Sequence, residues 1–197
     1  MKRNYIILAI LASVWAIIES QLGTVLHATR LPFVGLIMMT IGIFFQTAAR
    51  LVTKMRGSAL LVAVVVSFIK LLFVGGVAIA TVIAIFIQSI LLEAIYAQRA
   101  PSRLRLSIAA GSALCYSLIH PFLTMPLFLG LTLVDAYNRV IKAGSIMFGL
   151  PADSGLLIIA ALFLLHFLTG FLTGIISYNM IVKMIRGGFL SVFVDKE

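Results

Sequence analysis

The sequence predicts an all-α integral membrane protein, a bundle of six transmembrane helices with both termini in the cytoplasm. Of its 197 residues, 62% are hydrophobic and only 11% are charged, a far more apolar composition than a soluble domain needs. The apolar residues form runs of about the length that crosses a bilayer. Lys and Arg gather at the ends of these runs, where they act as topology signals. The formal charge of +9 therefore indicates a lipid bilayer and not a nucleic acid as partner.

Six apolar runs are bounded by charged residues, Gly or Pro. They cover residues 5–22, 34–49, 59–73, 77–95, 106–134 and 155–182. The second and third runs are short, so we expect flanking residues to extend them or the bilayer to thin around them. No convincing signal-peptide cleavage site follows the first run, which we interpret as an uncleaved helix. Residues 1–197 are expected to form one transmembrane domain.

Basic residues predict the orientation. If the runs cross the membrane in alternating directions, three basic residues lie on one face, namely Arg30, Arg139 and Lys142. The other face carries Lys2, Arg3, Arg50, Lys54, Arg56, Arg99, Arg103, Arg105, Lys183, Arg186 and Lys196. Because short cationic loops stay in the cytoplasm, both termini are expected there.

The connections between the runs differ in length. Residues 74–76 form a tight hairpin, whereas 23–33 and 135–154 are expected to be long outward-facing loops of the kind that gate a site. The fifth run contains Pro121 and Pro126, so its outer third is expected to be kinked or broken. Broken backbone at membrane depth must be buried or line a cavity.

Ionisable residues in the runs are few and predict a site near the external surface. At 1.5 Å per residue, Glu19 lies roughly 20 Å and Lys70 roughly 16 Å above the start of its helix. The candidate substrate-binding residues at this level are Lys70, His120, Arg30, His27, Glu19, Asp135, Tyr116 and Tyr137. The cations and imidazoles suit a carboxylate or phosphate, and the tyrosines suit a ring.

Each of these residues also has a structural interpretation. Glu19 and Lys70 could snorkel or pair with each other. His120 could satisfy the helix break before Pro121, and His27 and Arg30 could be solvated. The sequence also suggests that Glu93 neutralises the basic residues that follow it, and that His166 is a hydrogen-bonded histidine of the bundle.

Small residues at four-residue spacing predict close helix contacts. They form Ala12-x-x-x-Ala16 in the first run and Gly170-x-x-x-Gly174 in the sixth. Phosphate-loop, H-E-x-x-H and Gly-x-Ser-x-Gly motifs are absent from the sequence, so no enzyme activity is expected. The three histidines lie on separate elements, and no metal or cofactor is expected. Cys115 is interpreted as an inert buried thiol.

The chain resembles the substrate-binding S component of energy-coupling factor transporters. The resemblance rests on six short-looped helices with both termini inside, on Ala12-x-x-x-Ala16 and on the first outer loop. The stretch Leu31-Pro-Phe-Val-Gly-Leu and the later Gly57-Ser58-Ala59-Leu60-Leu61 resemble uncharacterised members of this group.

This resemblance implies a protein of the prokaryotic cytoplasmic membrane that captures a vitamin or a related small polar organic solute. A transmembrane coupling (T) subunit and ABC-type ATPases would drive uptake, and Ala12 and Ala16 would contact the coupling subunit. The first outer loop would cover the ligand. Metal-carrying members begin with a metal-binding histidine near the N-terminus, whereas this chain begins Met-Lys-Arg-Asn, so a metal substrate is not expected.

Glu19 lies only about 20° around the helix from Ala12, at 100° per residue. Either the first helix bends, or Glu19 pairs with Lys70 at the edge of the pocket, which we favour. Two other functions remain open. A stand-alone carrier or channel would need a polar path through the inner half, where Gln46, Gln88, Glu93 and Asn179 are the main polar residues. A haem or quinone anchor would use His120 and His166.

Overall fold

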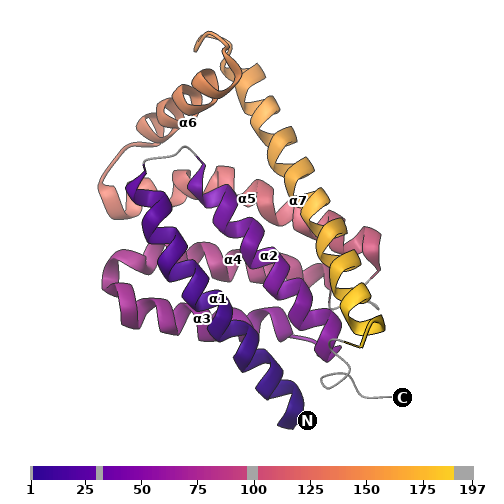
Figure 1. The fold of residues 1–197 in the computed structure, drawn as a ribbon. Coiled ribbons are helices and arrows are strands. Elements are labelled where there is room, and N and C mark those ends of the chain that lie inside the picture. The colour runs from indigo at the N-terminus through magenta and orange to yellow at the C-terminus, as the bar shows by residue number, and fades with distance from the viewer. Residues whose placement is uncertain (1, 30–32, 97–101, 189–197) are drawn as a thin grey trace.

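The computed structural model describes residues 2–29, 33–96 and 102–188, and this part of the chain is helical without strands (Figure 1). Its elements are α1 (Lys2–Ala28), α2 (Val34–Thr53), α3 (Ser58–Val74), η1 (Gly75–Ala78), α4 (Ile79–Tyr96), α5 (Arg103–Leu129), α6 (Leu133–Phe148) and α7 (Gly155–Arg186). Among the described residues, five helices are long and apolar enough to cross a membrane, and α3 is an apolar helix of 17 residues. This is the architecture of a helical, multi-pass membrane protein.

Three sequence predictions about the outer segments are wrong. Helix α1 continues to Ala28, so most of the expected loop 23–33 is helical. Helix α5 is not broken at Pro121 or Pro126 and continues to Leu129, because neighbouring groups in a bundle can compensate for a lost backbone bond; a kink at these prolines stays a prediction. The expected loop 135–154 contains the 16-residue helix α6.

Helix α6 begins and ends with strong local signals. Thr132 and Asp135 form a capping box at its start, which satisfies backbone N–H groups that the first turn leaves unpaired. Gly149 ends the helix in the left-handed conformation, with a φ of 65°, which glycine adopts without steric cost.

Helices α5 and α7 approach each other closely where small residues face backbone. A Cβ on Gly174 would lie 2.5 Å from the Ser107 Cα, and one on Gly170 would collide with the Ala110 carbonyl oxygen. Gly170 lies at the middle of α7, and Gly174 lies one turn nearer its C-terminal end. Away from it, α5 and α7 separate toward the end where α6 connects them (Figure 1). The small residues therefore close one end of the pair and leave the other open.

The Ala12-x-x-x-Ala16 ridge is an internal packing contact. Both alanines have an exposed fraction of 0%, and they belong to a core cluster with Ala63 of α3 and Phe45 of α2. In this structure neither side chain reaches a surface where a coupling subunit could contact it. The close approach that these small residues permit is used by α3, and their contact with a coupling subunit stays a prediction.

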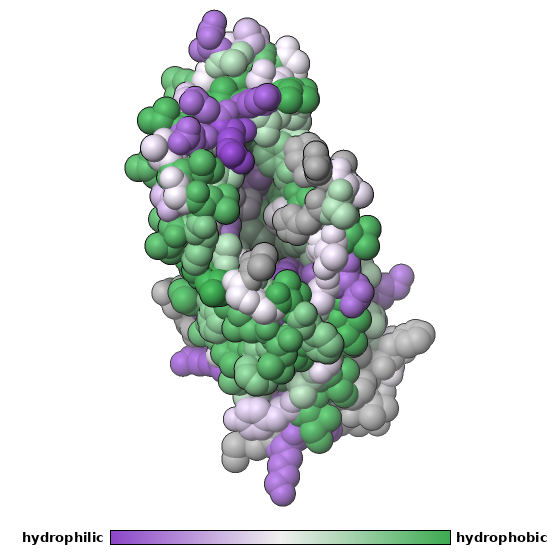
Figure 2. Space-filling view, turned by 90° about the vertical axis from the view of Figure 1, so that its left-hand side faces the viewer, coloured by the Kyte–Doolittle hydropathy of each residue, from purple (hydrophilic) through white to green (hydrophobic). Residues whose placement is uncertain are grey.

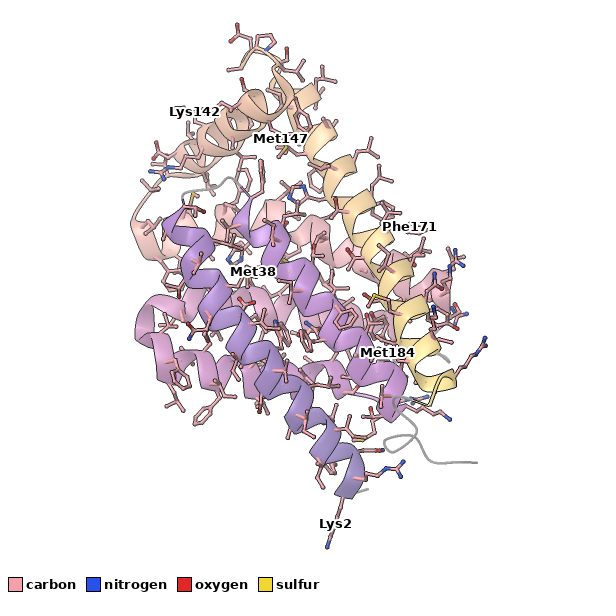
Figure 3. All side chains as sticks on the ribbon, viewed as in Figure 1. Lys2, Met38, Lys142, Met147, Phe171 and Met184 are labelled. Atoms are coloured by element: carbon pink, nitrogen blue, oxygen red, sulfur yellow. The ribbon has the colours of Figure 1, made fainter. Side chains whose placement is uncertain are left out.

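The start of α1 and the end of α7 lie at the same end of the bundle. Figure 3 shows Lys2 and Met184 at this end and Lys142 and Met147, both on α6, at the other. We call the first the inner end and the second the outer end. At the inner end, the Glu93 carboxylate accepts hydrogen bonds from the backbone N–H groups of Gly57 (2.5 Å) and Ala59 (3.3 Å). Glu93 thus caps α3 from α4, a role that its neighbouring basic residues did not suggest.

Candidate functional site

A cavity of about 470 Å³ lies toward the outer end of the bundle, and each of the helices α1 to α7 contributes to its lining. This volume falls within the range of about 300–1,000 Å³ that is typical of small-molecule sites. Figure 2 shows the molecule hollowed next to a group of hydrophilic residues near one end. The charged and polar side chains that line the cavity are Glu19, Lys70, Thr81, Gln88, Ser117, His120, Arg139 and His166.

An ion pair lies in the wall of this cavity. Lys70 Nζ of α3 donates to Glu19 Oε1 of α1 at 2.7 Å. The two residues are only 7% and 2% exposed. The pairing that the helical geometry favoured is therefore confirmed. Because each charge neutralises the other, neither is available as a lone charge for a ligand without separating the pair.

Two histidines, His120 and His166, line the same cavity. His120 Nδ1 is hydrogen-bonded to the hydroxyl of Tyr116 at 3.0 Å, one turn earlier on α5. His166 Nδ1 lies 2.7 Å from the carbonyl oxygen of Leu162, which only accepts, so this nitrogen carries a proton and Nε2 is the free acceptor of the neutral ring. The edge of His166 packs against Phe33, with ring centroids 5.7 Å apart. His166 is a site residue that its position in an apolar run did not reveal.

Gln88 forms part of the cavity wall deeper in the bundle. Its Nε2 donates to the Met39 carbonyl oxygen at 2.9 Å, which leaves its side-chain oxygen as an acceptor. A Cβ on Gly42 would lie 2.7 Å from Trp15 and 3.2 Å from the Gln88 amide nitrogen, so glycine here lets these large groups meet. Pro121 also lines the cavity, and it has no N–H to bond the Ser117 carbonyl four residues earlier.

Helix α6 contributes Arg139, Val140 and Ala143 to the cavity. From the sequence, Arg139 is expected only as a basic residue of an outer loop. The signal that could have found it is the amphipathic pattern of 133–148, in which the buried residues Ala136, Ile141 and Gly144 recur at helical spacing.

Asp135 and Tyr137 hold α6 in place and do not line the cavity. Asp135 Oδ2 accepts hydrogen bonds from the Thr132 backbone (2.9 Å) and hydroxyl (2.7 Å). These bonds, helped slightly by Arg139, hold the pKa of Asp135 below its usual value. The Tyr137 hydroxyl packs against Gly155 at the start of α7.

The remaining expected site residues have different outcomes. Tyr116 is buried, 7% exposed, and reaches the cavity only through His120. Arg30 and the side chain of His27 lie outside the described residues.

Below the cavity, toward the inner end, polar groups continue between α2 and α4. Thr47 and Tyr96 are joined through their hydroxyls at 3.2 Å, and Arg50 Nη2 donates to the Tyr96 carbonyl oxygen at 3.0 Å. The side-chain amide of Gln46 is fully buried without a hydrogen-bond partner in the described part of the chain. These groups are packed into the bundle, so a polar route through the protein would require α2 and α4 to separate.

Comparison with protein families, with curated proteins and with solved structures finds no match for this chain. Its function is therefore inferred from the site itself.

Proposed function

We propose that this protein is the substrate-capture subunit of an energy-coupling-factor type transporter and binds a vitamin or a related small polar organic solute. Uptake would be driven by a separate transmembrane coupling subunit and by ABC-type ATPases. The protein would lie in a prokaryotic cytoplasmic membrane with both termini inside. The observation that carries this proposal is the one-sided cavity, which gathers the buried ion pair, two histidines and Arg139 at the end away from the basic inner surface.

The physical reason is the cost of polar groups in a membrane protein. A charged side chain at the centre of a membrane helix costs at least about 2.5 kcal/mol. A bundle that keeps several such groups around one cavity obtains no folding advantage from the empty space. A bound polar solute, by contrast, uses the free acceptors of His166 and Gln88. The closed packing below the cavity favours capture by one subunit and translocation by others.

The proposal is tested by filling the cavity. The protein is purified in lipid nanodiscs, and whatever small molecule accompanies it is extracted and identified by mass spectrometry. Ala143→Phe places a ring in the cavity, whereas Ala160→Phe adds the same ring on the exposed face of α7. We expect a metabolite with the parent protein and with Ala160→Phe, and its loss with Ala143→Phe. A protein that carries no metabolite and shows no thermal shift with any of a panel of vitamins would contradict capture.

Proteoliposomes distinguish the stand-alone carrier. Capture by a subunit predicts binding without net transport when this protein is reconstituted alone, and uptake only with the coupling subunit and ATPases. Accumulation of the solute by the protein alone would favour the carrier.

A haem anchor is a second candidate because His120 and His166 line the same cavity and each has its Nδ1 occupied by a hydrogen bond. Their Nε2 atoms are the nitrogens that haem iron would bind. Addition of haem to the purified protein would produce a shifted Soret band in this case. We expect no such band. A shifted Soret band that appears with the parent protein and is lost in His166→Ala would support the haem anchor instead.

A further inference from the structure

The charges around the cavity do not contribute equally to a ligand. Glu19 and Lys70 are joined at 2.7 Å, and their charges cancel. Arg139 is the other charged residue among those that line the cavity. It is exposed, and it lies on α6, at the outer boundary of the cavity.

Arg139 has donors available for a ligand. In the described part of the chain, no residue accepts a hydrogen bond from its guanidinium. Asp135, one turn earlier on α6, uses Oδ2 for its two hydrogen bonds to Thr132. A guanidinium with its donors unused at the mouth of a cavity favours an oxyanion, because two parallel N–H groups match a carboxylate or phosphate.

The position of Arg139 is held by the packing of α6. Gly144 lies against Ile158 and Leu162 of α7 so closely that a Cβ would collide with Ile158. This contact and the capping box fix the helix at its middle and at its start. Arg139 lies between them and next to Val140, which also lines the cavity.

Much of the remaining wall is apolar. It includes Phe33, Leu36, Met38, Ile85, Leu118 and Val140. Gln88 and His166 also line the cavity. Both side chains are neutral when the imidazole is unprotonated, and each has an acceptor atom. The cavity thus combines one cationic end with apolar walls and neutral acceptors.

We infer that the ligand is a small organic anion with an apolar body, and that Arg139 of α6 binds its acid group while the body fills the apolar part of the cavity. This inference rests on the proposed function and adds to it the charge of the substrate and a specificity-determining residue. Lys70, one of the cations that the sequence offered for a carboxylate or phosphate, neutralises Glu19.

The test measures which molecules the protein captures from a mixture. Nanodiscs made only of phosphatidylcholine and carrying the protein are incubated with filtered yeast extract and washed. Aqueous and lipid extracts are then analysed separately by mass spectrometry. The variants are Arg139→Gln, Arg139→Lys and the control Lys142→Gln, which removes an exposed charge from the same helix at a residue that does not line the cavity. Thermal unfolding verifies that each variant is folded.

We expect an organic acid in the aqueous extract from the parent protein and from Lys142→Gln. Its affinity for Arg139→Gln should be at least about tenfold lower, the effect of losing a charge-assisted hydrogen bond. Arg139→Lys should retain part of the binding because the charge remains. Each variant should unfold at the temperature of the parent, since Arg139 is exposed.

Other outcomes separate this inference from the proposed function. A neutral or cationic compound that Arg139→Gln captures as well as the parent would overturn the anion site and leave solute capture intact. Enrichment of nothing by the parent protein would contradict solute capture and the anion site together. A free fatty acid in the lipid extract, lost in Arg139→Gln, would retain the anion site and contradict capture of a soluble solute.

Discussion

Removing one partner of the Glu19–Lys70 pair should destabilise the protein far more than removing both. The charged groups are 2.7 Å apart, and the residues are 2% and 7% exposed. Loss of one member of a buried pair typically costs about 3–5 kcal/mol, because the other charge stays buried without compensation. The pair lies in the wall of a cavity, so we expect the lower end of this range, about 3 kcal/mol, for Lys70→Met and for Glu19→Gln.

The double variant Glu19→Gln/Lys70→Met leaves no isolated charge and should unfold within about 1 kcal/mol of the parent, since neutral replacements of buried pairs are often tolerated. Unfolding in mixed micelles with increasing dodecyl sulfate can be followed by fluorescence. The single tryptophan, Trp15, is 1% exposed and stacks on Phe45. Lys142→Met, which removes an exposed cation, is the control and should change the free energy of unfolding little.

The reasoning would be refuted if each single variant unfolded within about 0.5 kcal/mol of the parent. It would also be refuted if the double variant lowered the free energy of unfolding by the sum of the two single effects, because additivity means that the two charges do not interact.

Three further predictions concern two helix contacts and the cap of α6. Gly174→Ala should destabilise the protein, because the added Cβ would lie 2.5 Å from the backbone of α5. In the control Gly23→Ala the Cβ meets only a flexible methionine at 3.8 Å, so this variant should gain up to about 1 kcal/mol of helix propensity. Thermal unfolding compares the two variants, and equal stability would contradict the backbone contact. Ala12→Leu should destabilise the isolated protein by about 1–3 kcal/mol through overpacking. Unchanged unfolding without any partner present would contradict the tight packing of Ala12 against α3. Thr132 lowers the pKa of Asp135. The capping box should therefore stabilise α6 fully above the ordinary pKa of aspartate, and this stabilisation should be lost as the pH falls through the lowered pKa. Hydrogen exchange in the first turn of α6, relative to the intrinsic rate, should be faster at acidic than at neutral pH, and equal protection would exclude this stabilisation.

Several features follow from the sequence because they depend on local composition or on helical geometry. Apolar runs of sufficient length become helices wherever backbone groups cannot be left unpaired in lipid. The pairing of Glu19 with Lys70 follows as well, because both charges lie at a similar depth and need a partner. The fifth run is an exception, because its two prolines predict a break and the helix continues through Pro121.

The tertiary structure alone decided which faces meet and therefore where the cavity lies. Ala12 and Ala16 could permit close approach of any helix, and only the packing assigns them to α3. His166 of α7 and Arg139 of α6 line one cavity although they lie 27 residues apart in the sequence, and α6 crosses the end at which α5 and α7 are separated. Association of helices in lipid depends on complementary shape more than on polarity, and shape is a property of both partners that neither stretch of sequence contains by itself.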